Sequence, residues 1–421
     1  MEQPNLAMIP SGVKATKVYS IMPESGVGDF TFARSSTAYR LNKDGLWESS
    51  AANLPRLHYD LTNGNPDSCP CLLLEPASTN ILGYSETFSS WGQTRSAIVA
   101  DSIMSPDGSV NASKMKDDGS TGTDTSQRFL SVTVEEDEDY HFSVFAKKGS
   151  MDFIALRTGD FANGVGIGET FFNLATGAVG TTYANHTASI EKYPNDWYRC
   201  IIKFTSGTDL SGTLLIRQAS ADGTSTVPLD GNSFVYLWGA QFEKTTSSKT
   251  ASSYIKSDSN SQTTRSAETC NSAGNASTFN SEQGVLFAEI AALDELQTVA
   301  NISISDGLSD RVLIALTGGE LKGQFVSSAS NVSKNTSGVT IENYNKIACF
   351  YTSTTFKVFV NGSQVNTTST GLTALASVNE LAFDRGDGGL GFYGKCKDLR
   401  YYDTEGMTDT EINNLLTELT Q

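Results

Sequence analysis

The feature of this sequence that most constrains its fold is a series of short runs in which apolar side chains recur with a period of two. Runs of this kind cover residues 140–145, 197–204, 234–238 and 355–360. In the first run, Tyr140, Phe142 and Val144 alternate with other residues. Successive side chains of a strand point to opposite faces, so each run predicts a strand with one face packed inward. Turn sequences separate the runs without long helical patterns between them, which predicts an all-β chain of antiparallel sandwiches.

The spacing of these runs predicts the domain organisation. Roughly the first 75 residues are dense in turn residues, until Leu72-Leu73-Leu74 predicts a buried strand. From Lys244 to about Gln283 the chain is rich in Ser, Thr, Asn and Lys, and the strand pattern then resumes. We therefore expect an extended N-terminal segment, a β-sandwich, a linker and a second β-sandwich, with bounds at 1–80, 81–265, 266–283 and 284–421.

Two local motifs define the second sandwich. Asn361-Gly362 follows an alternating run and predicts a tight hairpin, because both residues tolerate a positive φ. Thr408-Asp409-Thr410-Glu411 has the form of a capping box. One helical face follows it, formed by Ile412, Leu415, Leu416 and Leu419. These residues predict one short C-terminal α-helix packed on the sandwich.

Composition excludes several classes of function. The net charge of −17 argues against an extended nucleic-acid surface. No apolar stretch is long enough to span a bilayer, and the N-terminus lacks the pattern of a secretory signal. The six cysteines show no zinc-site spacing, so we interpret them as buried free thiols without disulfides, in a protein made in a reducing cytoplasm. No metal or cofactor is expected; Cys69 and Cys71 share a face if that segment is extended, but further ligands are not evident.

Several motifs carry a resemblance to a known family. The denser ones are Asn5-Leu6-Ala7-Met8, Ala33-Arg34-Ser35-Ser36, Leu54-Pro55-Arg56-Leu57, Cys69-Pro70-Cys71-Leu72-Leu73-Leu74-Glu75-Pro76 and Thr79-Asn80-Ile81-Leu82. Sparser ones follow at Asn195-Asp196-Trp197-Tyr198-Arg199, Trp238-Gly239-Ala240-Gln241-Phe242-Glu243, Ser253-Tyr254-Ile255 and Thr264-Arg265. Together they resemble a family of bacteriophage virion proteins, the fibre or spike subunits of head or tail. Family members usually have a small residue at the position of Cys71.

This resemblance implies a fold and a function. The central part would resemble a carbohydrate-binding jelly roll, and the C-terminal part a concanavalin A-like or laminin G-like sandwich. The implied function is that of a structural protein of the virion surface, assembled in the bacterial host cytoplasm, whose sandwiches attach to host glycans. Its partners would be capsid or tail proteins, host surface glycans and further copies of itself, with a homotrimer expected by analogy with phage fibres. The alternatives are a capsid decoration protein that stabilises the shell and, less favoured, a glycan-degrading tailspike.

The N-terminal segment has a specific expected role in this family. Residues 1–80 would dock onto the virion or a neighbouring subunit. Their short apolar runs suggest that a partner orders them.

Aromatic residues are the first candidates for glycan contact. Trp91, Trp197 and Trp238 could stack on sugar rings, but Trp197 and Trp238 lie within alternating runs, where core packing is the favoured interpretation. Trp47 is interpreted as an anchor for a subunit contact.

Acidic clusters are the next candidates. The loop Asp384-Arg385-Gly386-Asp387 could offer carboxylates to calcium, although its spacing is not that of an EF-hand, and a solvated turn is favoured. The run Glu135-Glu136-Asp137-Glu138-Asp139 is interpreted as a solvated turn that protects a strand edge, with a cation-dependent virion contact as the alternative.

No residue is assigned a catalytic role. With 47 Asp and Glu, a chance carboxylate pair is easily found, so the sequence does not single out a glycosidase pair. His58, His141 and His186 are far apart in sequence and lack a nucleophile motif. We therefore expect a protein that is not an enzyme.

Overall fold

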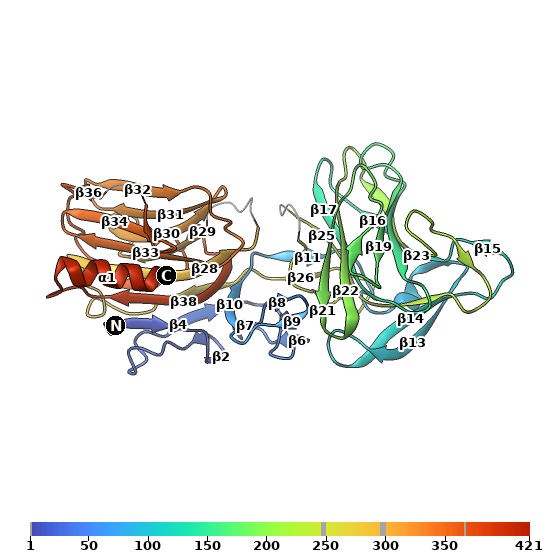
Figure 1. The fold of residues 1–421 in the computed structure, drawn as a ribbon, viewed down its shortest axis with the longest axis horizontal. Coiled ribbons are helices and arrows are strands. Elements are labelled where there is room, and N and C mark those ends of the chain that lie inside the picture. The colour runs from blue at the N-terminus through green and yellow to red at the C-terminus, as the bar shows by residue number, and fades with distance from the viewer. Residues whose placement is uncertain (1, 246–249, 295–299, 366–367) are drawn as a thin grey trace.

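The computed structural model describes residues 2–245, 250–294, 300–365 and 368–421. Two β-sandwiches lie side by side, and the N-terminal segment, in blue, runs along the C-terminal sandwich and between the two (Figure 1). Apart from two 3-10 turns, η1 (Phe88–Ser90) and η2 (Pro194–Asp196), the described chain has one helix, α1 (Asp409–Thr420). The all-β prediction with one short C-terminal helix is confirmed.

The central sandwich is a jelly roll of two six-stranded antiparallel sheets. The first, named here the β18 sheet, contains in spatial order β12 (Gly92–Thr94), β16 (Gln127–Thr133), β23 (Ser211–Ala219), β18 (Phe153–Gly159), β19 (Gly168–Asn173) and β20 (Ala178–Val179). The second, the β17 sheet, contains β13 (Ser96–Met104), β14 (Val110–Asp117), β25 (Phe234–Lys244), β17 (Asp139–Lys147), β22 (Trp197–Thr205) and β21 (Thr187–Tyr193). A small pair, β15 (Thr123–Asp124) and β24 (Val227–Pro228), lies apart from both sheets.

Period-two alternation explains the jelly-roll core. Tyr140, Phe142 and Val144 of β17 are buried against residues of the β18 sheet, such as Ile154 and Leu156. The alternate residues of β17 are also buried, because a second layer covers the outer face of this strand. The period of two therefore identifies the inward face of β17 correctly, although both faces of this strand are buried.

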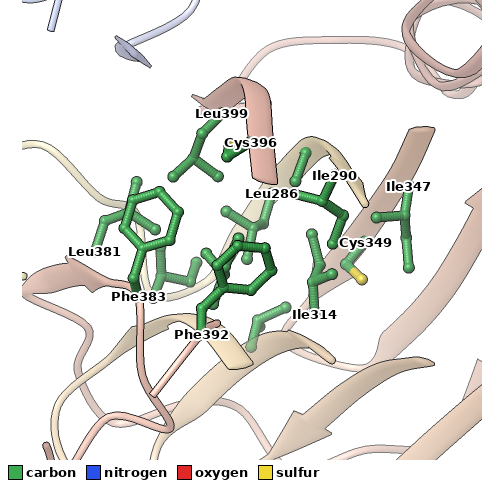
Figure 2. Close-up of a cluster of buried hydrophobic side chains, with 14 of the residues drawn as sticks. Leu286, Ile290, Ile314, Ile347, Cys349, Leu381, Phe383, Phe392, Cys396 and Leu399 are labelled. Atoms are coloured by element: carbon green, nitrogen blue, oxygen red, sulfur yellow. The ribbon is translucent and has the colours of Figure 1, made fainter. Parts of the chain in front are cut away.

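The C-terminal sandwich has the same two-layer plan. Its larger sheet, the β28 sheet, contains β35 (Ser363–Gln364), β34 (Thr355–Val360), β33 (Asn345–Thr352), β28 (Gln283–Ala292), β38 (Gly394–Tyr402), β10 (Cys71–Leu74) and β7 (Arg56–His58), with β1 (Leu6–Met8) on β38 and β36 (Ser369–Thr370) on β34. The facing β30 sheet contains β32 (Asn331–Thr336), β31 (Glu320–Val326), β30 (Arg311–Thr317), β29 (Ala300–Ser305) and β37 (Glu380–Ala382). Figure 2 shows side chains from both sheets meeting in this core, among them Leu286, Ile314 and Leu381.

The two local motifs of this sandwich form as predicted. Asn361 and Gly362 have φ values of 47° and 83° and connect β34 to β35, whose ends pair at Val360 and Ser363. The Thr408 side chain accepts a hydrogen bond from the Glu411 amide, and the Glu411 side chain accepts one from the Thr408 amide, which completes the capping box. The apolar face of α1 packs on the outer face of the β28 sheet. Among the described residues, no helix has the length and apolar character needed to cross a membrane.

The N-terminal segment is folded against its own chain. Its remaining strands are β2 (Val13–Lys14), β3 (Lys17–Val18), β4 (Phe30–Ala33), β5 (Ala38–Leu41), β6 (Trp47–Ser50), β8 (Leu61–Thr62), β9 (Asn65–Pro66) and β11 (Ser78–Asn80). β1 and β10 share one edge of β38, where Leu6 is opposite Tyr401 and Leu72 is opposite Cys396. The exposed edge of β38 provides hydrogen-bond partners for the short strands β1 and β10 within the chain, and docking of this segment onto an external partner stays a prediction.

The polar stretch before the second sandwich is also partly structured. β26 (Thr263–Arg265) pairs with β11, and β27 (Thr269–Asn271), inside the predicted linker, pairs with β4. The structure thus places a strand where a linker was expected, because the N-terminal segment supplies a neighbouring edge. Residues 246–249 of this polar stretch lie outside the described residues.

Candidate functional site

All four tryptophans are buried, each with no more than 4% of its surface exposed. Trp91 lies in the jelly-roll core, whereas Trp47, Trp197 and Trp238 lie in an aromatic cluster on the outer face of the β17 sheet. In that cluster the ring of Trp238 is 4.6 Å from the ring of Tyr254. The core interpretation is correct, and none of these rings is available to stack on a sugar. Trp47 does not anchor a subunit contact, because the β5–β6 hairpin places it against its own jelly roll.

A buried ionic network joins the N-terminal segment to the polar stretch that lies between the two sandwiches in the sequence. Glu268 accepts hydrogen bonds from Arg34 Nη1 at 2.7 Å and from Arg56 Nε at 2.9 Å. Glu75 accepts from Arg56 Nη1 at 2.6 Å and pairs with Arg265 Nη1 at 3.1 Å. We call these five residues the junction network. Each of their side chains is at most 5% exposed.

The junction network keeps its charges in spite of burial. Burial alone would raise the pKa of Glu75, but Arg265 and Arg56 hold that pKa well below its ordinary value. Burial likewise works against the charged form of Arg56, whose pKa is nevertheless raised because Glu268 and Glu75 face it. Each carboxylate of the network contacts two arginines, so the network is a structural element that holds the N-terminal segment on the polar stretch between the two sandwiches.

Beside this network lies a cleft of about 1360 Å³, lined by the N-terminal segment and both sandwiches. Asp60 is at the centre of its charged part. It accepts hydrogen bonds from Lys395 Nζ at 2.5 Å and from Tyr344 OH at 2.6 Å, and its carboxylate is 3.7 Å from His58 Nε2. Cys71 Sγ is 4.0 Å from the same carboxylate. Asp60, His58, Lys395, Tyr344 and Cys71 therefore form one cluster that sequence reasoning missed, since they come from distant positions.

This cluster contains the residue types of a nucleophilic site, a cysteine and a histidine. Their protonation states, however, are not those that such a site needs. Burial raises the pKa of the Cys71 thiol to about 12. Burial also lowers the pKa of His58 to about 3, with a further contribution from Lys395. A reactive thiolate needs the opposite shifts, a lowered thiol pKa beside a protonated imidazole. The chemistry of the cluster is that of an interdomain contact, with both the thiol and the imidazole neutral at pH 7.

The remaining thiols and histidines are also mostly enclosed. All six cysteines are free, and five are buried as predicted, whereas Cys69 is exposed because it precedes β10 in a surface turn. His186 is buried and contacts Thr158 Oγ1 at 3.1 Å and Thr170 Oγ1 at 2.9 Å. His141 lies fully buried on β17. The three histidines do not form a common site, since His58 belongs to the N-terminal segment and the others to separate faces of the jelly roll.

The carboxylates considered for calcium are bound within their own loop. Asp384 Oδ1 accepts a hydrogen bond from the Gly386 amide at 2.6 Å, and Asp387 pairs with Arg385 at 2.6 Å. Within the described ranges, no group of three or more His, Cys, Asp or Glu side chains is arranged to hold a metal ion.

The acidic run at 135–139 lies at the surface of the jelly roll. Lys244 Nζ contacts Glu135 at 2.9 Å and Glu138 at 2.8 Å, and Lys203 Nζ contacts Asp139 at 2.7 Å. These contacts place the run in a solvated turn beside the ends of β17, β22 and β25.

The outer face of the β18 sheet carries a different set of side chains. Ile154 and Leu156 point into the sandwich core, so Phe153 and Arg157 point outward. We call this surface the open sheet face and define it by Gln127, Phe129, Phe153, Arg157, Glu169 and Arg217. Three apolar residues of the same face, Ala155, Phe171 and Ala219, are buried.

A row of polar contacts crosses the open sheet face. Arg217 Nη1 and Arg157 Nη1 both donate to Glu169 Oε1, the latter at 3.2 Å. Arg217 Nε donates to Gln127 Oε1 at 2.6 Å, and Gln127 Nε2 donates to Thr94 Oγ1 at 3.2 Å. The row thus links β12, β16, β23, β18 and β19. Such a row of polar groups between aromatic rings can bind a ligand with hydroxyl and charged groups.

Sequence reasoning did not find this face. Arg157, Glu169 and Arg217 come from three strands, and register alone brings Arg157 opposite Glu169. The sequence offers one signal for this face. In 153–157, an aromatic residue and a charged residue both occupy outward positions of the same strand.

No family model matches the chain, and no curated protein matches it. Among solved structures, it is similar to the CBM40 domain of a Ruminococcus gnavus IT-sialidase bound to α2,3 sialyllactose, with 16% identity, a TM-score of 0.27 and coverage of 32% of this chain and 83% of that one. It is also similar to domain 4 of a Geobacillus stearothermophilus GH43 extracellular arabinanase in complex with arabinotriose, with 15% identity, a TM-score of 0.30 and coverage of 37% and 73%.

A further similar structure covers a larger share of this chain. The mouse laminin α1 chain, domains LG4-5, is similar with 8% identity, a TM-score of 0.24 and coverage of 65% of this chain and 85% of that one. The similar structures thus include carbohydrate-binding and laminin G domains.

Proposed function

We propose that this chain is a non-enzymatic attachment protein of the bacteriophage virion surface that binds glycans on its open sheet face. The observation that carries the glycan part is the row of polar side chains between Phe129 and Phe153. Sugar hydroxyls require such hydrogen-bonding groups, and the C–H faces of sugar rings pack on aromatic side chains.

The outer faces of the β17 and β28 sheets are covered by other parts of the chain, and that of the β30 sheet is covered in part. The β5–β6 hairpin and Tyr254 pack on the β17 sheet, and α1 packs on the β28 sheet. The loop at 384–390 lies over part of the β30 sheet, where Asn301 Nδ2 donates to Leu390 O at 2.9 Å. The side chains that define the open sheet face keep access to solvent. This difference favours the open sheet face as the place where a ligand binds.

The virion part of the proposal rests on the resemblance of residues 5–91 to phage fibre and spike proteins. In this proposal the N-terminal segment contacts capsid or tail proteins through surfaces that its own chain leaves free. Assembly as a homotrimer would present three open sheet faces, and linked weak sites can gain a factor of about 10²–10⁴ in avidity. A single site therefore needs only modest affinity.

Removing both rings of the open sheet face is expected to weaken glycan binding by about 5- to 150-fold. The rings of Phe129 and Phe153 supply the apolar contact for the sugar, at about 0.5–1.5 kcal/mol each. The measurement is binding of wild-type and Phe129→Ala/Phe153→Ala protein to a printed array of bacterial surface glycans.

Val110→Ala is the matched control, because Val110 is apolar and 60% exposed on a hairpin of the opposite sheet. Equal glycan binding by the double variant and the wild type would contradict the assignment of the face. Release of reducing or unsaturated ends during incubation would instead show a glycan-degrading tailspike.

Antibody raised against residues 284–421 is expected to label intact phage particles, and excess soluble protein is expected to reduce their adsorption to host cells. Electron microscopy of labelled particles locates the protein on head or tail. Label on the head together with unchanged adsorption would favour a capsid decoration protein, and particles without label would contradict the virion assignment.

A further inference from the structure

The two arginines of the open sheet face have N–H groups that no residue of the described chain uses. Arg157 donates to Glu169 through Nη1, which leaves Nε and Nη2 free. Arg217 uses Nε and Nη1, which leaves Nη2 free. None of these three nitrogens is among the buried polar atoms without a partner, so all three remain open to solvent. The face therefore presents unused cationic donors to an incoming ligand.

The free N–H groups of Arg157 have a defined geometry. Nε–H and Nη2–H lie on one edge of the planar guanidinium and point the same way. This edge matches the two oxygens of a carboxylate, which accept two parallel hydrogen bonds. Glu169 already fixes the opposite side of the guanidinium through Nη1, so the free edge is held in place before a ligand arrives.

The local charge is also unbalanced. Two guanidinium groups share one carboxylate, which leaves a net charge of about +1 on the row, in a chain whose net charge is −17. The three side chains are only partly exposed, at 25% for Arg157, 15% for Glu169 and 14% for Arg217. Partial burial reduces screening by water, so this excess charge acts on a ligand more strongly than a fully exposed arginine would.

We propose that the open sheet face selects acidic glycans, with Arg157 and Arg217 binding the carboxylate of a uronic-acid-type sugar. The proposal rests on the proposed glycan-binding function and adds the class of ligand. The carboxylate binds the free edge of Arg157 and the Nη2 group of Arg217, and the sugar ring packs near Phe153 or Phe129. Both rings are diagonal neighbours of Arg217 in the sheet, because Phe153 is opposite Ala219 and Phe129 is opposite Leu215.

The test uses oligogalacturonate and the same oligosaccharide after chemical reduction of its carboxyl groups. Wild-type protein is expected to bind the acidic form at least tenfold more tightly than the reduced form, and this preference is expected to shrink as salt is raised. Arg157→Gln/Arg217→Gln is expected to lose the preference. Lys203→Gln is the matched control, because it removes a cation that pairs with Asp139 on the opposite sheet.

A further variant separates ligand binding from a structural role. Glu169→Gln removes the carboxylate that competes with the ligand, so it is expected to increase affinity for oligogalacturonate several-fold. A purely structural role of the row would make both the arginine variant and the Glu169 variant bind less. Tight binding of the reduced form equal to that of the acidic form would overturn the acidic selectivity and leave the proposed function intact. Wild-type protein that binds neither form, nor any glycan on the array, would overturn both.

Discussion

Replacing Glu268 with glutamine is expected to lower the free energy of unfolding by about 3–5 kcal/mol, the cost of breaking a buried ion pair by removing one partner. In the native structure, the two oxygens of Glu268 accept hydrogen bonds from Arg34, Arg56 and the amide of Glu75. A glutamine places an amide N–H against at least one of these donors. It also leaves the cationic charge of Arg34 and Arg56 only partly compensated in a region without water access.

Urea-induced unfolding, followed by tryptophan fluorescence, measures this loss, because all four tryptophans are buried in the folded chain. Glu48→Gln is the matched control, since Glu48 is 48% exposed and pairs with Arg40 at 3.2 Å at the surface. That control is expected to change stability by less than about 1 kcal/mol. A Glu268→Gln protein as stable as the control would show that the junction network does not hold the N-terminal segment in place.

Sequence patterns were sufficient to predict a structural element wherever the residues that determine it lie close together in the chain. The period of two in 140–145 predicted β17 and its inward residues, and the Asn361-Gly362 pair predicted the turn after β34. The capping box at Thr408 predicted the start of α1. In each case the side chains that decide the conformation lie within a few residues of one another, so pattern and turn chemistry determine the result.

Contacts between distant segments could not be predicted in this way. The run Leu72-Leu73-Leu74 was correctly predicted as a buried strand, yet it joins the β28 sheet, more than 300 residues away in sequence, beside Cys396. Strand pairing between distant segments depends on which edges are exposed after each sandwich has formed. A single sequence does not show which strand edges are exposed. For this reason the N-terminal segment was expected to need an external partner.

The motifs that carried the family resemblance acquire a physical role in the structure. Arg34, Arg56, Glu75 and Arg265 all stand within the quoted motifs, and all four belong to the junction network. The sequence contains the charged partners of these residues, but it does not show that the residues are buried or that they meet. These motif residues therefore hold parts of the chain together, whereas the side chains proposed to contact a ligand lie outside the motifs, on β16, β18 and β23.

Acidification from pH 8 to pH 5 is expected to destabilise the protein by about 2 kcal/mol for each buried histidine. Burial lowers the pKa of His58 to about 3 and the pKa values of His141 and His186 to about 4. In the unfolded chain these groups take up protons near pH 6.5, while in the folded chain they stay neutral. The stability that the neutral, buried histidines contribute is therefore fully present above pH 6.5. It is lost progressively as the pH falls toward 3–4. Below pH 4.5 the lowered pKa of Glu75 adds a loss of the same sign.

His186 allows this prediction to be tested at one residue, because burial alone lowers its pKa. His186→Gln keeps groups that can hydrogen-bond to Thr158 and Thr170 but does not titrate, so the loss of stability between pH 8 and pH 5 is expected to shrink by about a third. His186→Phe loses both hydrogen bonds and is expected to be less stable at pH 8, with the same smaller pH dependence. Urea unfolding at pH 8, 6.5 and 5 provides the comparison. An identical pH dependence in the wild type and both variants would show that His186 does not contribute to the acid sensitivity, and that its imidazole is charged or exposed in the folded protein.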